Sequence, residues 1–364
     1  MENISKNIVE ALGAYNSIGT VTEAKPFGNG HINTTYKVSV GNANYILQRI
    51  NTYVFKDPRG VMENIEGVTE HIRRKNAEMG KDTSRCTMKI VKTDDGQLYF
   101  EDSEKNAWRM YEFTENTVSL DAARNADDFR NSAKAFGHFQ CLLADYPAHT
   151  LCEPIKDFHN TPVRYENFVK ALEADKSGRA DCAIPEIEFV KARKSFTEVL
   201  EKANKEGALP LRVTHNDTKL NNILFDADSG DAVCVVDLDT VSPGYSVTDF
   251  GDAIRFGANT AAEDEKDVSK VSLDLDLFRA YAEGFIEGCD GRLEKSEIAL
   301  LPEGAMMMTL ECGMRFLTDY LDGDVYFHTA YPEHNLVRCR TQFELFADME
   351  RKKAEMDRII AELA

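Results

Sequence analysis

The spacing of apolar residues changes part-way along this 364-residue chain, and that change constrains the fold more than any other feature. Up to about residue 112 the chain reads as short strands with a period of two, as at 34–38 and 45–50. Apolar residues at helical spacing predict one inserted helix at 57–75. Helical patterns dominate later. The sequence therefore predicts an α+β fold with a small antiparallel β lobe over residues 1–112 and a large, mostly helical lobe over residues 113–364.

The other predicted elements follow from the same patterns. In the first lobe these are a short helix at 4–15 and strands within 25–40 and at 87–92, 97–100 and 108–113. In the second lobe, short strands lie within 211–239, and helical segments at 128–145, 165–207, 274–288, 293–321 and 335–363. A cleft between two such lobes is a common place for a ligand.

The chain is strongly acidic, with 43 Lys and Arg against 62 Asp and Glu and a net charge of −19. Such a surface repels nucleic acid and anionic lipid, so neither is an expected partner. No stretch approaches the ~20 apolar residues that span a bilayer, and the N-terminus lacks a signal-peptide pattern. The eight cysteines form no C-x-x-C pair, which fits reduced thiols. We therefore expect a cytoplasmic protein.

The segment richest in chemistry is HNDTKLNN, at 215–222. It matches H-x-D-x-x-x-x-N, the catalytic-loop pattern of kinases. An acceptor hydroxyl must lose a proton as phosphate arrives, so Asp217 is expected to be the catalytic base. The amide oxygen of Asn222 suits Mg²⁺ and adds no negative charge that would repel phosphate. Lys219 is expected either to stabilise the moving phosphoryl group or to be an exposed surface lysine.

The residues after this motif predict a hairpin that ends on a second carboxylate. Strand-like residues 223–225 and 233–236 flank the turn-like stretch 226–231, and Asp237 follows directly. A hairpin returns the chain to the end at which Asn222 stands. The sequence therefore predicts that Asn222 and Asp237 share one magnesium site.

Three nearby residues leave alternatives open. His215 more often orients such a loop through hydrogen bonds than acts as a base. Asp249, in a literal D-F-G, lies too far along the chain for one short hairpin to join it to Asn222. We expect Asp249 either to brace the catalytic loop or to cap the helix that follows. Asp239 would point to the same side as Asp237 if the strand continues, and would either support the metal site or be solvated.

In the first lobe, Gly28 and Gly30 lie in a turn between two strands. Backbone N–H groups of this turn could cover phosphates, although such a turn is usually only a hairpin. His31, in the same turn, could point into the cleft.

These residues resemble a known family. The catalytic loop, with the segments GHINTTY at 30–36, DFGDAIRFGA at 249–258 and ECGMRFLTDYLDGDVYF at 311–327, is similar to the aminoglycoside phosphotransferase and choline-kinase-like group. That group has a protein-kinase-like fold. Within it, the chain looks most like the sugar 1-kinases that act on N-acetylhexosamines. The resemblance implies transfer of phosphate from ATP to the anomeric hydroxyl of N-acetylglucosamine or N-acetylgalactosamine.

The resemblance also implies roles for individual residues. Asp217 is the base, and Asn222 and Asp237 are magnesium ligands. The residues expected to contact the sugar are His31, Asp217, Arg315 and Tyr326. The residues expected near the nucleotide are Gly28, Gly30, Gln48, Glu66, Met110 and Glu112. Arg315 also stands out by itself, because a charge on an otherwise apolar helix should be paired or face a site.

The third strand departs from the kinase pattern. Kinases place there a lysine that holds the ATP phosphates and pairs with a helix glutamate. Here Gln48 or Arg49 occupies the neighbourhood, and by strand alternation only one of them can reach ATP. Glu66 is the candidate partner on the following helix.

Two other functions remain open. A kinase of the same fold could act on another alcohol, such as an aminoglycoside, choline or homoserine. The second alternative is a nucleotide-binding scaffold without catalysis, and its only support is the absence of a lysine on the third strand. The expected partners are ATP and an amino sugar, with the chain a monomer or weak dimer.

Overall fold

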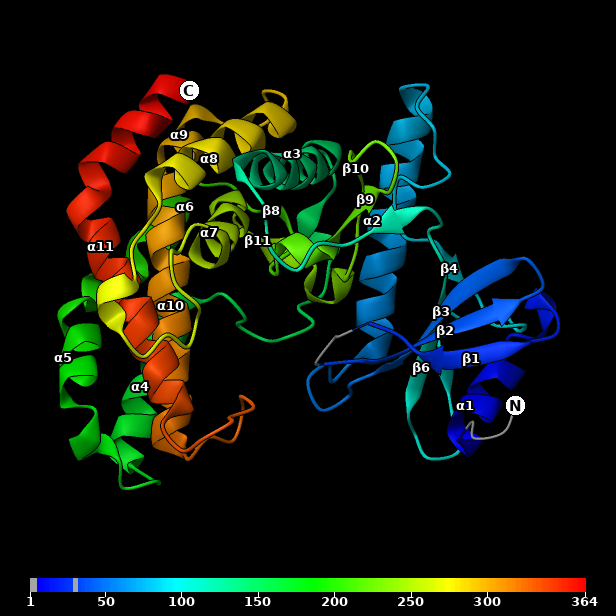
Figure 1. Ribbon diagram of the computed structural model, residues 1–364, viewed down its shortest axis with the longest axis horizontal. Helices are drawn as coiled ribbons and strands as arrows, with labels where there is room; N and C mark the ends of the chain where they lie inside the picture. Colours follow the sequence, from blue (N-terminus) through cyan, green and yellow to red (C-terminus); the bar gives the residue numbers. More distant parts are fainter. Residues whose placement is uncertain (1–4, 29–31) are drawn as a thin grey trace. The chain divides into compact units, whose positions relative to one another are not determined.

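The computed structural model describes residues 5–28 and 32–364 (Figure 1). The chain forms two compact units. The first comprises Met1–Val118, His149–Lys156 and Leu224–Ser242, and the second comprises Ser119–Ala148, Asp157–Ile223 and Pro243–Ala364. The predicted boundary after residue 112 does not account for two later segments, His149–Lys156 and Leu224–Ser242, which belong to the first unit.

The first unit contains an antiparallel sheet with the strand order β1-β2-β3-β6-β4, and β5 also pairs with β6. The strands are β1 (Glu23–Pro26), β2 (Thr34–Val40), β3 (Ala43–Ile50), β4 (Ile90–Val91), β5 (Phe100–Glu101) and β6 (Ala107–Glu112). Its helices are α1 (Lys6–Gly13) and α2 (Pro58–Glu78). The predicted small β-rich part with an inserted long helix is confirmed.

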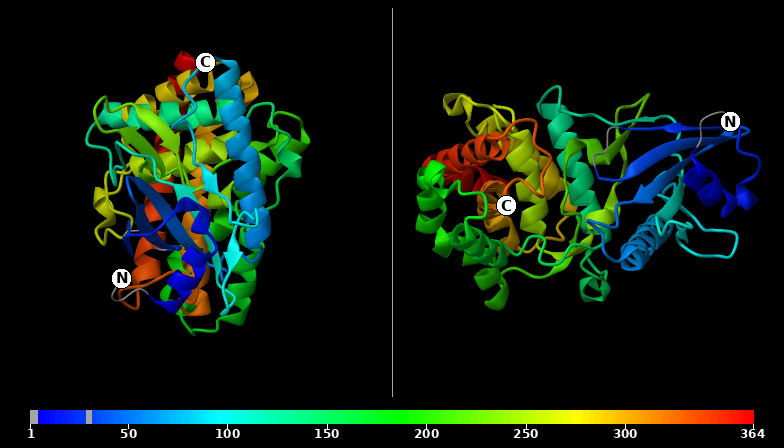
Figure 2. Two further views of the ribbon diagram at one scale, coloured as in Figure 1. Left: turned by 90° about the vertical axis from the view of Figure 1, so that its right-hand side faces the viewer. Right: turned by 90° about the horizontal axis from the view of Figure 1, so that it is seen from below.

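The two faces of this sheet have different neighbours. On one face, Leu47 and Met110 form a buried cluster with Ile8 of α1. Successive side chains of a strand alternate between the faces, so Arg109 belongs to the other face. There its guanidinium contacts the sulfur of Met62 on α2 at 3.9 Å. Figure 2 shows α2 lying along the sheet.

A single amide on α2 fastens the two later segments to the first unit. Asn64 Nδ2 donates to the carbonyl oxygens of Cys152 and Val241, each at 2.9 Å. Its Oδ1 accepts the N–H of Cys152 at 3.0 Å. Donors and acceptor of this buried side chain are thus all used, as burial requires.

The predicted hairpin is present. Strands β9 (Ile223–Asp226) and β10 (Ala232–Val235) are neighbours in a three-stranded sheet with β7 (Thr117–Val118). The strand ends before Asp237, which has left-handed backbone angles with φ 60°. The chain then forms a short 3-10 turn at Leu238–Thr240, so the alternation argument used for Asp239 does not hold.

The second unit is mostly helical, which confirms the other half of the predicted fold class. Its helices are α3 (Ala126–Leu142), α4 (Thr161–Ala174), α5 (Ile184–Ala192), α6 (Val199–Lys205), α7 (Ser246–Gly257), α8 (Leu275–Cys289), α9 (Lys295–Ala299), α10 (Leu301–Asp322) and α11 (His334–Leu363). Two short strands, β8 (Arg212–Thr214) and β11 (Ser242–Gly244), pair with each other. Among the helices of residues 5–28 and 32–364, none has the length and apolar character needed to cross a membrane.

Helix α10 is the buried axis of this unit, flanked by α7 and α11 (Figure 1). Its contact with α7 depends on glycine. A Cβ on Gly251 would lie 2.2 Å from the carbonyl oxygen of Gly304, and one on Gly304 would lie 2.1 Å from that of Val247. The two backbones therefore touch directly, which fixes the helices that carry the side chains described next.

Candidate active site

The catalytic-loop segment 215–222 is braced from α7. Asp249 accepts the backbone N–H of His215 at 2.9 Å and that of Asn216 at 2.8 Å. Gln140 donates to the same carboxylate at 2.8 Å. Burial raises the pKa of Asp249 above its ordinary value, and these N–H donors offset only part of that rise. Of the two roles expected for Asp249, its hydrogen bonds are those of a loop brace.

His215 is fully buried beneath this loop. Its ring meets Phe136 and Phe139 edge-on, with centroids 5.4 and 6.0 Å apart. Its Nδ1 lies 3.3 Å from the backbone N–H of Asp217 and accepts it. These contacts orient the loop, in agreement with the role favoured from the sequence.

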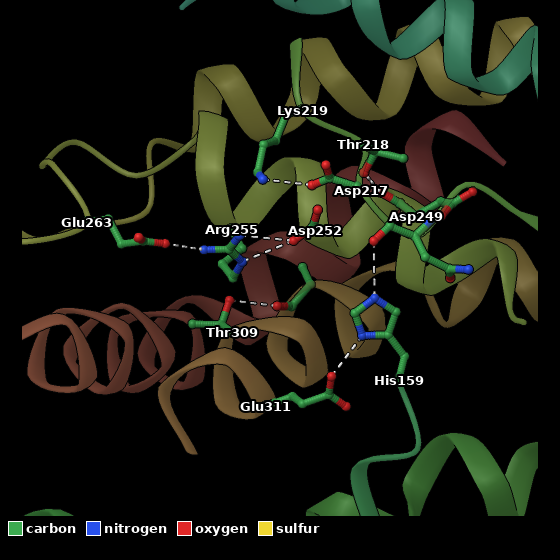
Figure 3. A network of polar contacts seen from close by, with 12 residues as sticks. His159, Asp217, Thr218, Lys219, Asp249, Asp252, Arg255, Glu263, Thr309 and Glu311 are labelled. Carbon is green, nitrogen blue, oxygen red and sulfur yellow. Dashed lines mark hydrogen bonds and ion pairs between the residues drawn. The ribbon is translucent and has the colours of Figure 1, made fainter. Parts of the chain in front are cut away.

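Asp217 contacts two side chains of its own loop, Lys219 (Figure 3) and Asn222. The Lys219 ammonium lies 2.8 Å from Oδ1 of Asp217. Asn222 Nδ2 donates to Oδ2 of Asp217 at 3.1 Å and to its backbone oxygen at 2.8 Å. The Asp217 side chain is 27% exposed, so a hydroxyl can reach it.

Lys219 belongs to a larger set of charges. Burial lowers its pKa, but Asp217 and Asp252 together raise it above the ordinary value. Asp252 in turn accepts hydrogen bonds from Arg255, and both of these side chains are buried. Lys219 therefore lies beside the Asp217 carboxylate, and its side chain is 38% exposed.

The predicted magnesium ligands have the right chemistry for a hard cation. The amide nitrogen of Asn222 donates to Asp217, which leaves the amide oxygen available as a metal ligand. Asp237 offers a carboxylate. Within residues 5–28 and 32–364 no group of three or more His, Cys, Asp or Glu is arranged to hold a metal. Mg²⁺ usually binds through one or two protein side chains and takes its other ligands from phosphate and water, so Asn222 and Asp237 stay predicted ligands.

A second cluster surrounds Arg315 on α10. Its guanidinium carbon lies 5.2 Å from the ring centre of Phe158, 5.8 Å from that of Tyr326 and 5.5 Å from that of Phe327. In the described part of the chain this guanidinium contacts rings and makes no hydrogen bond. The structure therefore brings two predicted sugar contacts, Arg315 and Tyr326, together, with hydrogen-bond donors to spare.

The loop that carries Tyr326 is fixed by a residue that the sequence argument missed. Asp319 accepts the backbone N–H groups of Val325, Tyr326 and Phe327 at 2.9, 2.7 and 2.9 Å. Asn335 donates to the same carboxylate at 2.8 Å. The available signal was an aspartate on an otherwise apolar stretch of α10, the same signal that singled out Arg315.

The predicted nucleotide contacts all come from the first unit. Gly28 has φ +75°, a conformation that favours glycine, and open space where a Cβ would be. Gly30 and His31 lie outside the described residues. Gln48 faces Arg109 and accepts from it at 3.0 and 2.9 Å. The neighbouring Arg49 is exposed and reaches Thr34.

Three further predicted residues have other partners. Glu66 pairs with Lys92 at 2.7 Å, so in this structure it makes no ion pair with the third strand. Met110 lies in the core cluster of the sheet, and Glu112 pairs with Lys89 at 3.2 Å. Their contact with a nucleotide stays a prediction.

The sequence argument missed Arg109, which is buried on β6 and paired with Asp239. Of the two alternatives for Asp239, the solvated one is wrong, because this carboxylate is only 2% exposed. A charged residue in the apolar strand at 107–111 was the available signal for Arg109.

Comparison with known families adds to this geometry. The phosphotransferase enzyme family matches residues 23–284, well over half of the chain, including the catalytic loop and Asp249. The chain belongs to this family. It is a phosphotransferase, which agrees with the broader part of the sequence prediction.

Solved structures similar to this phosphotransferase share its fold over nearly its whole length. An aminoglycoside phosphotransferase from Alicyclobacillus acidocaldarius has a TM-score of 0.62 at 11% identity, covering 100% of this chain and 97% of that chain. A microcompartment-associated aminopropanol kinase has a TM-score of 0.57 at 15% identity, covering 97% and 99%. A spectinomycin phosphotransferase, solved with ADP and spectinomycin, has a TM-score of 0.53 at 11% identity, covering 98% and 100%. At these identities the likeness shows the fold alone.

Proposed function

We propose that this phosphotransferase is a kinase that transfers the γ-phosphate of ATP to the anomeric hydroxyl of an N-acetylhexosamine. Family membership supports phosphoryl transfer, and the aromatic setting of Arg315 supports the acceptor. The observation that carries the proposal is the geometry of Asp217, a reachable carboxylate held by Lys219 and Asn222.

In the proposed mechanism, Asp217 accepts the proton of the acceptor hydroxyl. The hydroxyl oxygen forms a bond to the γ-phosphorus as the bond to ADP breaks. Lys219 lies close enough to the base to stabilise charge on the moving phosphoryl group. Positioning and charge stabilisation supply most of the rate enhancement in such reactions.

Asn222 and Asp237 are the proposed magnesium ligands, and bound Mg²⁺ would neutralise charge on the ATP phosphates. The hairpin of β9 and β10 supports this proposal, because β9 starts directly after Asn222 and Asp237 comes two residues after β10. The Gly28 turn is proposed to cover the phosphates through backbone N–H groups.

The charge around Arg315 favours a neutral acceptor over a cationic one. A second arginine, Arg164, lies near Arg315. Burial and, after it, the positive charge of Arg315 lower the pKa of Arg164. Two of the Arg164 nitrogens donate to the carbonyl oxygen of Phe158, at 3.1 and 2.8 Å. Choline or an aminoglycoside would bring a further positive charge to this cluster, whereas an N-acetylated sugar brings hydroxyl and amide oxygens that arginine can bind.

The test is magnesium-dependent ADP release with a panel of acceptors: N-acetylglucosamine, N-acetylgalactosamine, choline, ethanolamine, homoserine and an aminoglycoside. We expect turnover with an N-acetylhexosamine and loss of its reducing end, since phosphate on the anomeric oxygen blocks it. The methyl glycoside of the same sugar lacks the anomeric hydroxyl and is the matched control, which should be inert.

Two results would redirect the assignment. Turnover with an amino alcohol or aminoglycoside alone would replace the sugar by that acceptor. Magnesium-dependent ATP binding without transfer to any member of the panel would favour the nucleotide-binding scaffold.

A further inference from the structure

The peptide bond between Asn216 and Asp217 is held at both of its polar atoms. Its N–H, from Asp217, donates to His215 Nδ1 at 3.3 Å. Its carbonyl oxygen, from Asn216, lies 3.3 Å from Nε2 of His159. Asn216 has φ 64°, an uncommon conformation for a residue other than glycine, so this turn needs such support.

His159 reaches this peptide from outside the catalytic loop, just before α4. Its Nδ1 lies 2.7 Å from Oε1 of Glu311, a side chain of α10 that is 1% exposed (Figure 3). Thr161 donates to the other oxygen of Glu311 at 2.6 Å. Both ring nitrogens of His159 therefore lie against oxygen atoms, Nδ1 against a buried carboxylate and Nε2 against a backbone carbonyl.

Charged side chains of three helices interact with this pair. Glu311 of α10 and Asp252 of α7 interact with His159, and Arg315 of α10 and Arg164 of α4 interact with Glu311. Burial raises the pKa of Glu311, but His159 and then the two arginines lower it below the ordinary value.

Glu311 and Arg315 are four residues apart, so they share one face of α10. Three links therefore lead from the helix that carries the proposed acceptor arginine to the residue before the proposed base. They are the helical turn between Arg315 and Glu311, the Glu311–His159 pair, and the hydrogen bond from His159 to Asn216.

We propose that His159, held by Glu311, is a positioning residue for phosphoryl transfer. It fixes the carbonyl group of Asn216 and so the direction in which the Asp217 carboxylate points at an acceptor bound beside Arg315. This inference rests on the proposed role of Asp217 as the base. It assigns His159 no contact with substrate or nucleotide.

The first test compares wild type with His159→Gln, Glu311→Gln and the double variant, measuring kcat and KM for both substrates. A glutamine at 159 carries both of its donors on one nitrogen, so it cannot reproduce the contacts that the two separate ring nitrogens make. We expect kcat to fall roughly 10–100-fold, because small misplacements of a catalytic group have effects of that size. ATP affinity should be unchanged, and the double variant should be no slower than the slower single variant, since both changes break one chain of contacts.

The matched control is His149→Gln, because His149 is an exposed histidine ten residues earlier. It should retain wild-type kcat. Glu311→Gln keeps the size of the side chain and one acceptor oxygen, so it remains informative if His159→Gln folds poorly.

The second test needs no substrate. Amide hydrogen exchange in the segment that contains Asn216 and Asp217 should be faster in Glu311→Gln and His159→Gln than in wild type or His149→Gln. Unchanged exchange there, or equal losses of kcat and ATP affinity, would overturn the proposed role of His159.

The two proposals fail separately. If wild type phosphorylates a different acceptor, the sugar assignment falls, while the ratio of kcat between His159→Gln and wild type is measured with that acceptor instead. If His159→Gln has wild-type kcat with any accepted alcohol, the positioning role falls and the sugar assignment stands.

Discussion

Arg109 and Asp239 form an ion pair in which the side chains are only 2% and 3% exposed. Two guanidinium nitrogens of Arg109 approach the two carboxylate oxygens at 2.5 and 2.9 Å. Gln48 of the third strand accepts from the same guanidinium, and Asn33 donates to Asp239 at 2.6 Å. The pair thus ties strand β6 to the segment that carries Asp237, all within the first unit. A positive charge is present beside the third strand even though that strand lacks a lysine.

Breaking this pair should be costly. Burial lowers the pKa of Arg109, but Asp239 raises it above its ordinary value, so the guanidinium stays charged. We expect Arg109→Met to lower the free energy of unfolding by about 3–5 kcal/mol, because it leaves a buried carboxylate without its partner. Urea unfolding measures this. Arg49→Met, an exposed arginine on β3, should stay within about 0.5 kcal/mol of wild type. A small effect of Arg109→Met would show that Asp239 finds another partner.

Arg315→Met should weaken binding of the acceptor and leave the nucleotide unaffected. Methionine keeps much of the apolar contact with the three rings but removes the donors. Loss of two hydrogen bonds from a charged group corresponds to roughly a 10²-fold fall in kcat/KM for the sugar. Steady-state kinetics with each substrate varied in turn measure this. Arg358→Met, at an exposed position on α11, is the control. A change confined to the KM for ATP would contradict an acceptor contact of Arg315 and indicate a nucleotide contact instead.

Lys219→Met should slow the chemical step. The ammonium lies 2.8 Å from Oδ1 of Asp217, the proposed base. We expect kcat to fall roughly 10²-fold, the usual effect of removing one stabilising donor. Lys219→Arg should recover part of this loss. Lys202→Met, at an exposed lysine on α6, is the control and should leave kcat unchanged. Wild-type kcat in Lys219→Met would return this residue to the surface-lysine alternative.

Glu311 should make stability depend on pH in acid. Burial raises its pKa, but His159 and the nearby arginines lower it below the ordinary 4.5. As the pH falls, the unfolded chain takes up this proton before the folded protein does. The stabilising contribution is therefore complete above about pH 4.5 and is lost below it. The difference in unfolding free energy between wild type and Glu311→Gln should be largest near pH 7 and shrink below pH ~4.5. Glu188→Gln, an exposed site, should show no such trend.

The sequence predicted the parts of the fold that local pattern determines. The α2 helix and the β9–β10 hairpin follow from periodicity and turn residues over short stretches. The left-handed backbone at Asp237 did not follow, and it made the alternation argument for Asp239 fail. Periodicity describes a strand only while the strand continues, and here the chain leaves it at Val235.

The candidate catalytic loop was proposed from its motif alone, because the residues of that motif lie within eight positions. Side-chain pairs that are far apart in the sequence could not be found that way. His159 and Glu311 are 152 residues apart, and Arg109 and Asp239 are 130 apart. Only the folded chain brings such partners together. One partner of each pair, Arg109 or Glu311, stands out as a charge in an apolar strand or helix, but nothing in the pattern identifies the residue that pairs with it.

The most direct measurement of the central claim is kcat of Asp217→Asn with an N-acetylhexosamine at saturating ATP and Mg²⁺. The Asn side chain keeps the size of Asp217 but cannot accept the proton. We predict turnover by wild type and a kcat roughly 10²–10⁴-fold lower in the variant, with ATP affinity retained. Near-wild-type kcat in Asp217→Asn would contradict the assignment of Asp217 as the base.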